Sequence, residues 1–305
     1  MTINALLPAL APMTLAALAF NLAGAQFAER GYEMTAYSKP GAAGTVYLDI
    51  SDNGTIVGAW SSDGFLNHSA GLVRRLGEET SVEVPESGYL ELDAISSGGR
   101  VVGDYWNATF SRNTSFIRSR DGGITVIAPP APDTVCVCPF GVNESGVIVG
   151  VYDTDPTFAT SSAYILDDGV YSFFNHPNPQ AVQTQFNGIN NSGVIVGRWR
   201  DASHVSHPFV FQDGEFQDFE IPGAGSAAAY SINDRGQIGG YYTVGAATYG
   251  FLYDDGEVTT FDFGGLGNTR IFGLNNSGQM VGAVNFPGLD AQALVITPSP
   301  GRRVK

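Results

Sequence analysis

The sequence of 305 residues predicts an all-β protein, a six-bladed β-propeller with four strands in each blade. Three observations lead to this fold class. A repeat of about 45 residues recurs six times, each copy contains four short apolar or aromatic runs, and the last copy lacks its fourth run. Repeats of this length cannot bury their apolar faces alone, so they must pack side by side in a ring or an array.

A glycine in a tight turn marks each copy of the repeat, as in GINNSGVIVGRW at positions 188–199. A left-handed residue in such a turn costs any residue other than glycine about 1–2 kcal/mol, which explains why glycine recurs. The marker glycines are separated by 42 to 47 residues and are Gly54, Gly99, Gly146, Gly193, Gly236 and Gly278.

The fourth copy shows the predicted strands of one blade, which are QFNGI, VIVGRW, PFVFQ and FQDFEI. An Asn-x-x-Gly turn joins the first two, and the Asp213-Gly214 turn joins the last two. If the strands run from the axis outward, both short turns lie on one face of the ring, the tight-turn face. The longer connections lie on the opposite, long-loop face, where we expect ligands to bind because variable loops carry function.

The N-terminal part of the chain supplies the missing strand. The sixth copy stops at ALVITPSP, whereas GYEMTAY at positions 31–37 matches the outermost strand of the other copies. Pairing these segments closes the ring and removes an exposed sheet edge. We therefore predict a closing strand at about 31–39, a propeller over 26–298 and a C-terminal tail over 299–305.

Residues 6–25 read LLPALAPMTLAALAFNLAGA, an apolar run that is interrupted by two prolines and ends in small residues. This pattern predicts a signal peptide over residues 1–25, cleaved between Ala25 and Gln26, and hence secretion. The run is too short and interrupted for a transmembrane helix, and no second apolar span follows, so we expect no membrane insertion.

The composition restricts the partners. The formal net charge is −15, so nucleic acids and anionic membrane surfaces would be repelled. The two cysteines, Cys136 and Cys138, either form a small disulfide or stay free, and two thiols alone are too few for a metal site. The oligomeric state is left open by the sequence.

Aromatic residues gather where the second strand of each copy reaches the long-loop face. The aromatic residues at this place are Trp60, Tyr105, Trp106, Tyr152, Trp199, Tyr241 and Tyr242. We interpret most of them as packing between blades. Apolar residues in the long loops add an apolar mouth, which favours an apolar or aromatic small-molecule ligand. The predicted substrate-binding walls are Trp60, Phe65, Trp106, Phe110, Phe158 and Trp199.

Polar candidates on the same face are few. The hydrogen-bond donors that could polarise a ligand carbonyl are Arg112, Arg200, His204 and Tyr241. Three histidines could be neighbours (His176, His204 and His207), but two of them occupy ordinary positions of the repeat, so we predict no metal site and no cofactor. Carboxylates such as Asp104 and Asp153 would suit glycoside hydrolysis only as a correctly spaced pair, and no pair is marked.

Seven Asn-x-Ser/Thr sequons occur in the chain. Four belong to the repeat turn, where we expect the asparagine to make local hydrogen bonds. The other three lie in long loops and would carry glycans if the host is eukaryotic, and they are Asn67, Asn107 and Asn113.

The pattern INxxGxIVGxY followed by HxFxYxDGxxTxxDxPGA resembles the HAF repeat of secreted bacterial proteins, with its most faithful copies at 207–214 and 249–256. The resemblance covers nearly the whole mature chain and implies a scaffold without a known catalytic set. A similarity that rests on the signal peptide, the sequons and the apolar mouth links the chain to secreted, glycosylated fungal hetero-Diels–Alderases.

Two functions are therefore open. In the first, the protein holds an apolar intermediate of natural-product biosynthesis and lets it cyclise without a cofactor, since orientation alone lowers such a barrier. In the second, it is a non-catalytic binding or adhesion module for a glycan or a partner protein, while a hydrolase or lyase is a third, less favoured class. We prefer the first, because it explains both the apolar loops and the missing polar catalytic set.

Overall fold

The computed structural model describes residues 26–300, except residues 30, 65–68, 86, 108, 110–112, 267 and 286–290. The predicted signal peptide and residues 301–305 lie outside this part of the chain. Among the described residues, no helix has the length and apolar character that crossing a membrane requires.

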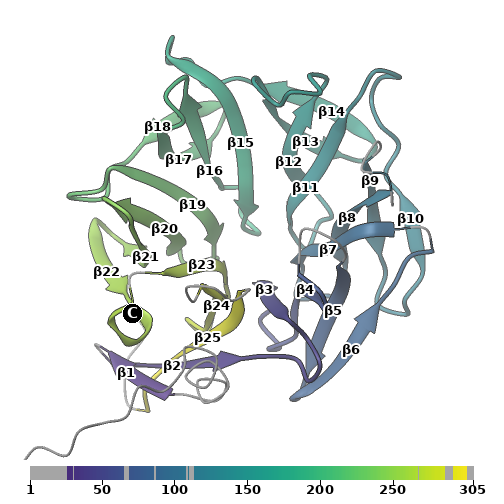
Figure 1. Ribbon diagram of the computed structural model, residues 1–305. Helices are drawn as coiled ribbons and strands as arrows, with labels where there is room; N and C mark the ends of the chain where they lie inside the picture. Colours follow the sequence, from purple (N-terminus) through teal and green to yellow (C-terminus); the bar gives the residue numbers. More distant parts are fainter. Residues whose placement is uncertain are drawn as a thin grey trace, which may run out of the picture.

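Six antiparallel sheets surround a central axis, which confirms the six-bladed propeller (Figure 1). Blades one to three contain β3 (Gly44–Ile50), β4 (Ile56–Ser61), β5 (Ala70–Arg75), β6 (Glu78–Val82), β7 (Ser87–Ile95), β8 (Val101–Asn107), β9 (Asn113–Arg118), β10 (Ile124–Val126), β11 (Cys136–Val142), β12 (Ile148–Asp153), β13 (Ser162–Asp167) and β14 (Val170–Phe174). Blades four to six contain β15 (Ala181–Ile189), β16 (Ile195–Asp201), β17 (Ser206–Gln212), β18 (Glu215–Asp218), β19 (Ser226–Ile232), β20 (Ile238–Val244), β21 (Ala247–Asp254), β22 (Glu257–Phe261), β23 (Thr269–Leu274), β24 (Met280–Val284) and β25 (Gln292–Pro298). One short 3-10 turn, η1 (Phe263–Gly265), connects blades five and six.

In blades one to five the strands follow one another in sequence order from the axis outward, and in blade six β23 is the innermost strand (Figure 1). Because neighbouring strands are antiparallel, the first and third connections of a blade lie on one face of the ring, and the second connection and the one to the next blade lie on the other. The second connection is not long in every blade, since only Gly245 and Ala246 separate β20 from β21 in blade five. Gly193 has a φ of 81° in the first hairpin of blade four, and its N–H donates to the carbonyl of Asn190. The predicted tight-turn and long-loop faces are therefore both present.

The N-terminal strand closes the ring as predicted. Strand β2 (Tyr32–Tyr37) pairs with β25 from Tyr32 opposite Pro298 to Tyr37 opposite Ala293. A further strand that the sequence analysis did not predict, β1 (Gln26–Glu29), pairs with β2. Blade six consequently has five strands, and its outer edge is formed by the N-terminal segment.

The core lies between the blades and follows the alternation of side chains along each second strand. The residue two positions after the glycine that recurs in that strand faces the preceding blade, where Trp199 packs among buried residues of blades three and four. Its equivalents are Trp60, Tyr105, Tyr152 and Tyr242, and each packs against a buried cluster. This confirms inter-blade packing for these aromatic residues.

Candidate functional site

Every innermost strand contains a β-bulge at the same place, and the extra residue of each bulge lines a cavity on the axis. A bulge inserts one unpaired residue and redirects the strand locally, which explains how a side chain is directed to the axis in all six blades. The bulge residues are Leu48, Asp93, Phe140, Asn187, Tyr230 and Phe272. The axial cavity has a volume of about 90 Å³.

The tight-turn end of this cavity is occupied by a closed ring of hydrogen bonds between blades. In blade four, the N–H of Asn191 donates to Asp234 of blade five, and the N–H of Asp234 donates to Asn276 of blade six. The ring closes where the N–H of Asn276 donates to Asp52 of blade one, at 2.8 Å. These polar turn residues stabilise the ring of blades, a role that the sequence analysis did not predict.

On the long-loop side of the bulges, blades four to six place five side chains together, which we call the arginine–tyrosine cluster: Arg198, Arg200, Tyr230, Tyr241 and Arg270. Arg198 and Arg200 alternate along β16 and therefore lie on the same face of the strand. Tyr230 and Tyr241 stack at a centroid distance of 5.3 Å, with their hydroxyl oxygens 3.4 Å apart. The Arg270 guanidinium lies 5.3 Å from the Tyr241 ring centroid.

All five side chains of the cluster are half-buried. Burial lowers the pKa of Arg200, and the positive charge of Arg198 lowers it further. Burial raises the pKa of Tyr230, while both arginines oppose this rise. The arginines therefore act electrostatically on the tyrosines from within a partly desolvated region.

Blade two, which is opposite blade five in a ring of six, carries the contrasting group. Here Glu91, Asp93 and Asp104 form what we call the carboxyl cluster. Glu91 of β7 lies opposite Asp104 of β8 in the register of the two strands. Asp93 and Asp104 are 8% and 6% exposed, and Asp93 lines the axial cavity. The hydroxyl of Tyr89 donates to Glu91 at 2.5 Å.

Burial is the main cause that raises the pKa of each of these carboxyls, and their mutual repulsion adds to it for Asp93 and Asp104. The pKa of Asp104 rises to about 7. The raised pKa values favour the protonated carboxyls, and a protonated carboxyl can donate a hydrogen bond. The sequence predicts Asp104 as a polar residue of the long-loop face, and the structure corrects this, because Asp104 is buried within β8.

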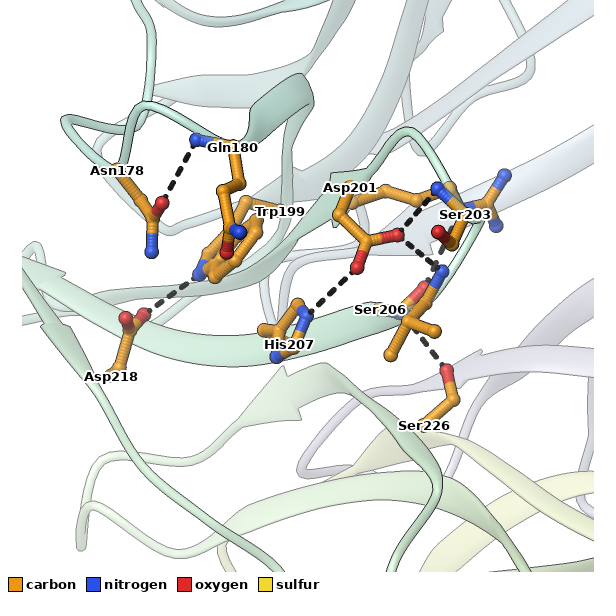
Figure 2. A network of polar contacts seen from close by, with 11 residues as sticks. Asn178, Gln180, Trp199, Asp201, Ser203, Ser206, His207, Asp218 and Ser226 are labelled. Atoms are coloured by element: carbon orange, nitrogen blue, oxygen red, sulfur yellow. Dashed lines mark hydrogen bonds and ion pairs between the residues drawn. The ribbon is translucent and has the colours of Figure 1, made fainter.

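A second polar network lies inside blade four (Figure 2). Trp199 is stacked between His207, at a centroid distance of 3.9 Å, and His176, at 5.2 Å. Its indole N–H donates to Asp218 at 3.1 Å, and Asp218 also lies 3.2 Å from His176 Nε2. Within the described part of the chain, no group of three or more potential ligands could hold a metal ion.

The structure separates the predicted substrate-binding walls. Trp199 is 4% exposed and belongs to the core of blade four, so it cannot be a wall. Trp60 packs between blades one and six, and its indole nitrogen is buried without a partner. Trp106 and Phe158 do meet, edge to face at 6.2 Å, and Phe158 is 42% exposed. Phe65 and Phe110 lie outside the described residues.

Of the predicted donors, Arg200 and Tyr241 come together in the arginine–tyrosine cluster. His204 does not, because it is exposed at the tip of the β16–β17 connection, with a φ of 64°. Arg112 lies outside the described residues. Arg198, Tyr230 and Arg270 each occupy a position that is present in all six repeats. Comparing the six residues at each of these positions is the sequence signal that would have pointed to them.

The predicted glycosylation sites differ in their surroundings. Asn107 is half-buried, and Asn67 lies outside the described residues. The Nδ2 atom of Asn113 is buried, so its side chain would have to turn outward before a glycan could be attached. The repeat asparagines Asn143, Asn190 and Asn275 are buried and make the local hydrogen bonds that the sequence predicted.

The two cysteines are joined. Cys136 and Cys138 form a disulfide within the innermost strand of blade three, and both are buried. Of the two alternatives left by the sequence, the structure contains the bonded one.

No protein-family model and no curated protein matches the sequence. Similar solved structures include an Aleuria aurantia lectin in complex with Fucalpha1-6GlcNAc, with 11% identity and a TM-score of 0.54 over 86% of this chain and 98% of that chain. A fucose-specific lectin from Aleuria aurantia has 11% identity and a TM-score of 0.52 over 88% and 96%. A catalytically inactive virginiamycin B lyase from Staphylococcus aureus with quinupristin has 13% identity and a TM-score of 0.51 over 87% and 99%. At these identities, the likeness shows the β-propeller fold alone.

Proposed function

We propose that the protein binds a small organic molecule on the axis, at the long-loop side of the bulge residues, and promotes its cyclisation without a cofactor. The observation that carries this proposal is the convergence of Arg200 and Tyr241, two donors from different blades, in one half-buried cluster. Phe272 meets the Tyr230 ring edge to face at 5.2 Å and adds an apolar surface to this place.

The chemistry needs few groups. In a hetero-Diels–Alder reaction, a diene and a double bond, one of which contains a heteroatom, exchange their three π bonds for two new σ bonds and one new π bond. No atom leaves and no electron is gained or lost. The protein then has to hold the reacting ends together and stabilise negative charge that develops on a carbonyl oxygen. A guanidinium N–H from Arg200 and the hydroxyl of Tyr241 are suitable donors for that oxygen. Trp106 and Phe158 supply aromatic surface for the apolar body of the ligand.

Natural-product biosynthesis in a secreted, glycosylated propeller is the setting we propose for this reaction. Its support is the N-terminal apolar run with small residues at the predicted cleavage site, and the sequons at Asn67 and Asn107. Edman sequencing of the protein isolated from the culture medium of its host checks the setting, because cleavage before Gln26 is expected.

Comparison of the metabolites of the host with and without the gene tests the function. Two further strains are compared in the same way. One carries the double variant Trp106→Ala/Arg200→Ala, and the other carries Arg75→Gln, a control at an exposed residue. We expect a cyclised product to disappear in the deletion and in the double variant, with acyclic precursors accumulating, and to persist with Arg75→Gln. An unchanged set of metabolites in the deletion strain would contradict the proposal.

A glycan-binding module is the second candidate, and one groove favours it. The groove has a volume of about 930 Å³, lies between blades four and five, and contains Phe219 and Tyr253 with ring centroids 4.8 Å apart. Asp254, Asp255 and Glu257 line it as well. Aromatic faces beside carboxylates suit a sugar, whose C–H groups contact rings and whose hydroxyls donate to carboxylates.

A glycan array with the wild-type chain and Tyr253→Ala tests this second candidate. We expect one glycan class to bind and Tyr253→Ala to weaken its binding about tenfold. Absence of glycan binding by the wild-type chain would contradict a glycan-binding module.

A further inference from the structure

The three arginines of the arginine–tyrosine cluster lack acidic partners, although the chain has twice as many acidic as basic residues. Within the described residues, none of Arg198, Arg200 and Arg270 has a carboxylate oxygen within 4.0 Å, since the ion pairs there involve other residues. Charged groups that are partly removed from water are normally paired. Three unpaired cations, two on blade four and one on blade six, therefore need an explanation.

Neutral groups of the protein satisfy only some of the guanidinium donors. Arg198 donates to Gln185 Oε1 at 3.1 Å and to Ser206 Oγ at 3.3 Å, and Arg200 reaches the same Ser206 Oγ at 3.5 Å. Arg270 contacts the face of Tyr241. A guanidinium has five N–H donors, so most donors of Arg200 and Arg270 are available to a ligand.

The like charges also repel one another. Arg198 and Arg200 lie on one face of β16, and arginine does not release its proton in proteins, so the repulsion persists at every physiological pH. An oxyanion between the guanidinium groups would offset both the repulsion and the lost hydration, and guanidinium forks bind carboxylates with two parallel hydrogen bonds.

We propose that Arg198, Arg200 and Arg270 bind an oxyanion of the ligand, and that this ligand is an organic acid whose carboxylate points to blade five while its apolar body extends toward Trp106 and Phe158. This inference rests on the proposed function and changes the predicted ligand from a wholly apolar one to an amphiphilic one.

The carboxyl cluster orients such a ligand. Glu91, Asp93 and Asp104 lie on blade two, opposite blade five and its two flanking blades that carry the arginines, and would repel a carboxylate when they are ionised. When protonated, they can donate to a hydroxyl or carbonyl of the ligand. Electrostatic repulsion at one wall and attraction at the other therefore specify a single direction of binding.

Titration calorimetry with the full chain tests this site with three probes at neutral pH: benzoate, its neutral analogue benzamide, and inorganic sulfate. We expect benzoate to bind at least about tenfold more tightly than benzamide, because only benzoate forms charge-assisted hydrogen bonds. The double variant Arg198→Gln/Arg200→Gln and the variant Arg270→Gln should each weaken benzoate binding about tenfold or more, whereas Arg75→Gln should not. Circular dichroism and thermal unfolding confirm that each variant is folded.

Equal binding of benzoate and benzamide by the wild-type chain would overturn the oxyanion site without relying on any variant. If Trp106→Ala weakened both probes in that case, ligand binding on the axis would remain supported and only the anion would be wrong. Sulfate binding as tight as benzoate would contradict an organic acid, and no saturable binding of any probe at about 10 mM would overturn the site. Benzoate binding through the arginines with an unchanged metabolome would support the site and contradict the catalytic function.

Discussion

Asp104 shows how a single residue can make stability depend on pH. Its pKa is about 7 in the folded protein, against an ordinary value of 3.8, because burial disfavours the charged carboxylate. Below pH 4 the carboxyl is protonated in both the folded and the unfolded chain. Between about pH 4 and pH 7 the unfolded chain releases this proton while the folded chain retains it, so the free energy of unfolding falls as pH rises.

The variant Asp104→Asn should remove this fall, because an amide does not ionise. We expect its stability relative to the wild type to increase from about pH 4 to pH 7 and to reach a gain on the order of 4 kcal/mol, since each unit of pKa difference corresponds to about 1.4 kcal/mol. Urea unfolding at several pH values measures the difference, and the exposed carboxyl of Asp167 provides the control Asp167→Asn. An unchanged pH slope in Asp104→Asn would mean that Asp104 is already ionised in the folded state.

Asn190 combines a turn with an inter-blade contact. Its side-chain oxygen accepts from the N–H groups of Ser192 and Val194, and its Nδ2 donates to the carbonyl of Asn233 in the next blade. In blade one the equivalent residue is Ser51, whose hydroxyl accepts from the N–H of Thr55. Serine therefore preserves a bond within the turn and loses the inter-blade bond.

We expect Asn190→Ala to lower the free energy of unfolding by roughly 1–3 kcal/mol, because two partly buried N–H groups lose their acceptor and Asn233 loses a donor. Asn190→Ser should cost less than Asn190→Ala. Urea unfolding of both variants measures the two losses, and equal losses would show that the contact with Asn233, rather than the turn, determines the contribution of Asn190.

At the scale of elements, the closing strand β2 determines whether the ring is complete. Met34 in β2 is 1% exposed and packs in the core of blade six, whereas Glu33 beside it is exposed. The strand also covers an edge of β25 that would otherwise be free to pair with another chain.

Met34→Ala should lower stability by roughly 2–5 kcal/mol, because a large buried side chain leaves a cavity. Glu33→Ala on the same strand should change stability by less than about 0.5 kcal/mol. Thermal unfolding with light scattering measures both, and we expect earlier aggregation for Met34→Ala. Equal unfolding midpoints for the two variants would contradict the role of β2 in closing the ring.

At the scale of the whole molecule, the net charge of −15 opposes compactness through self-repulsion. The described residues contain one Arg–Glu ion pair and two His–Asp pairs, so salt has few attractive contacts to screen. Screening should therefore remove more repulsion than attraction.

We expect the thermal midpoint to rise when NaCl increases from about 0.01 M to about 0.15 M, over which the screening length shortens from about 30 Å to about 8 Å. Differential scanning calorimetry measures the midpoint, and sucrose at equal osmolality controls for general solute effects. A midpoint that falls with NaCl would show that attractive pairs dominate the electrostatics of the fold.

Much of the architecture was predictable because it depends on local patterns. The spacing of the marker glycines, the Asp-Gly turns and the match between GYEMTAY and the outermost strands predicted six blades, two distinct faces and closure by the N-terminal strand. Strand β1 was not predicted, because a strand of four residues at a sheet edge has too little periodicity to identify.

The candidate site was predictable only in part, since Arg200 and Tyr241 were expected as donors but their partners Arg198, Tyr230 and Arg270 were not. The sequence by itself determined the number of blades, their order and the face that carries the long loops, because each of these follows from a period and a turn. Only the tertiary structure decided which side chains reach the axis. One bulge in every innermost strand redirects a residue such as Tyr230 toward the axis. Alternation along β16 buries Trp199 on one face of the strand and places Arg198 and Arg200 on the other. Closure of the ring sets blade two opposite blade five.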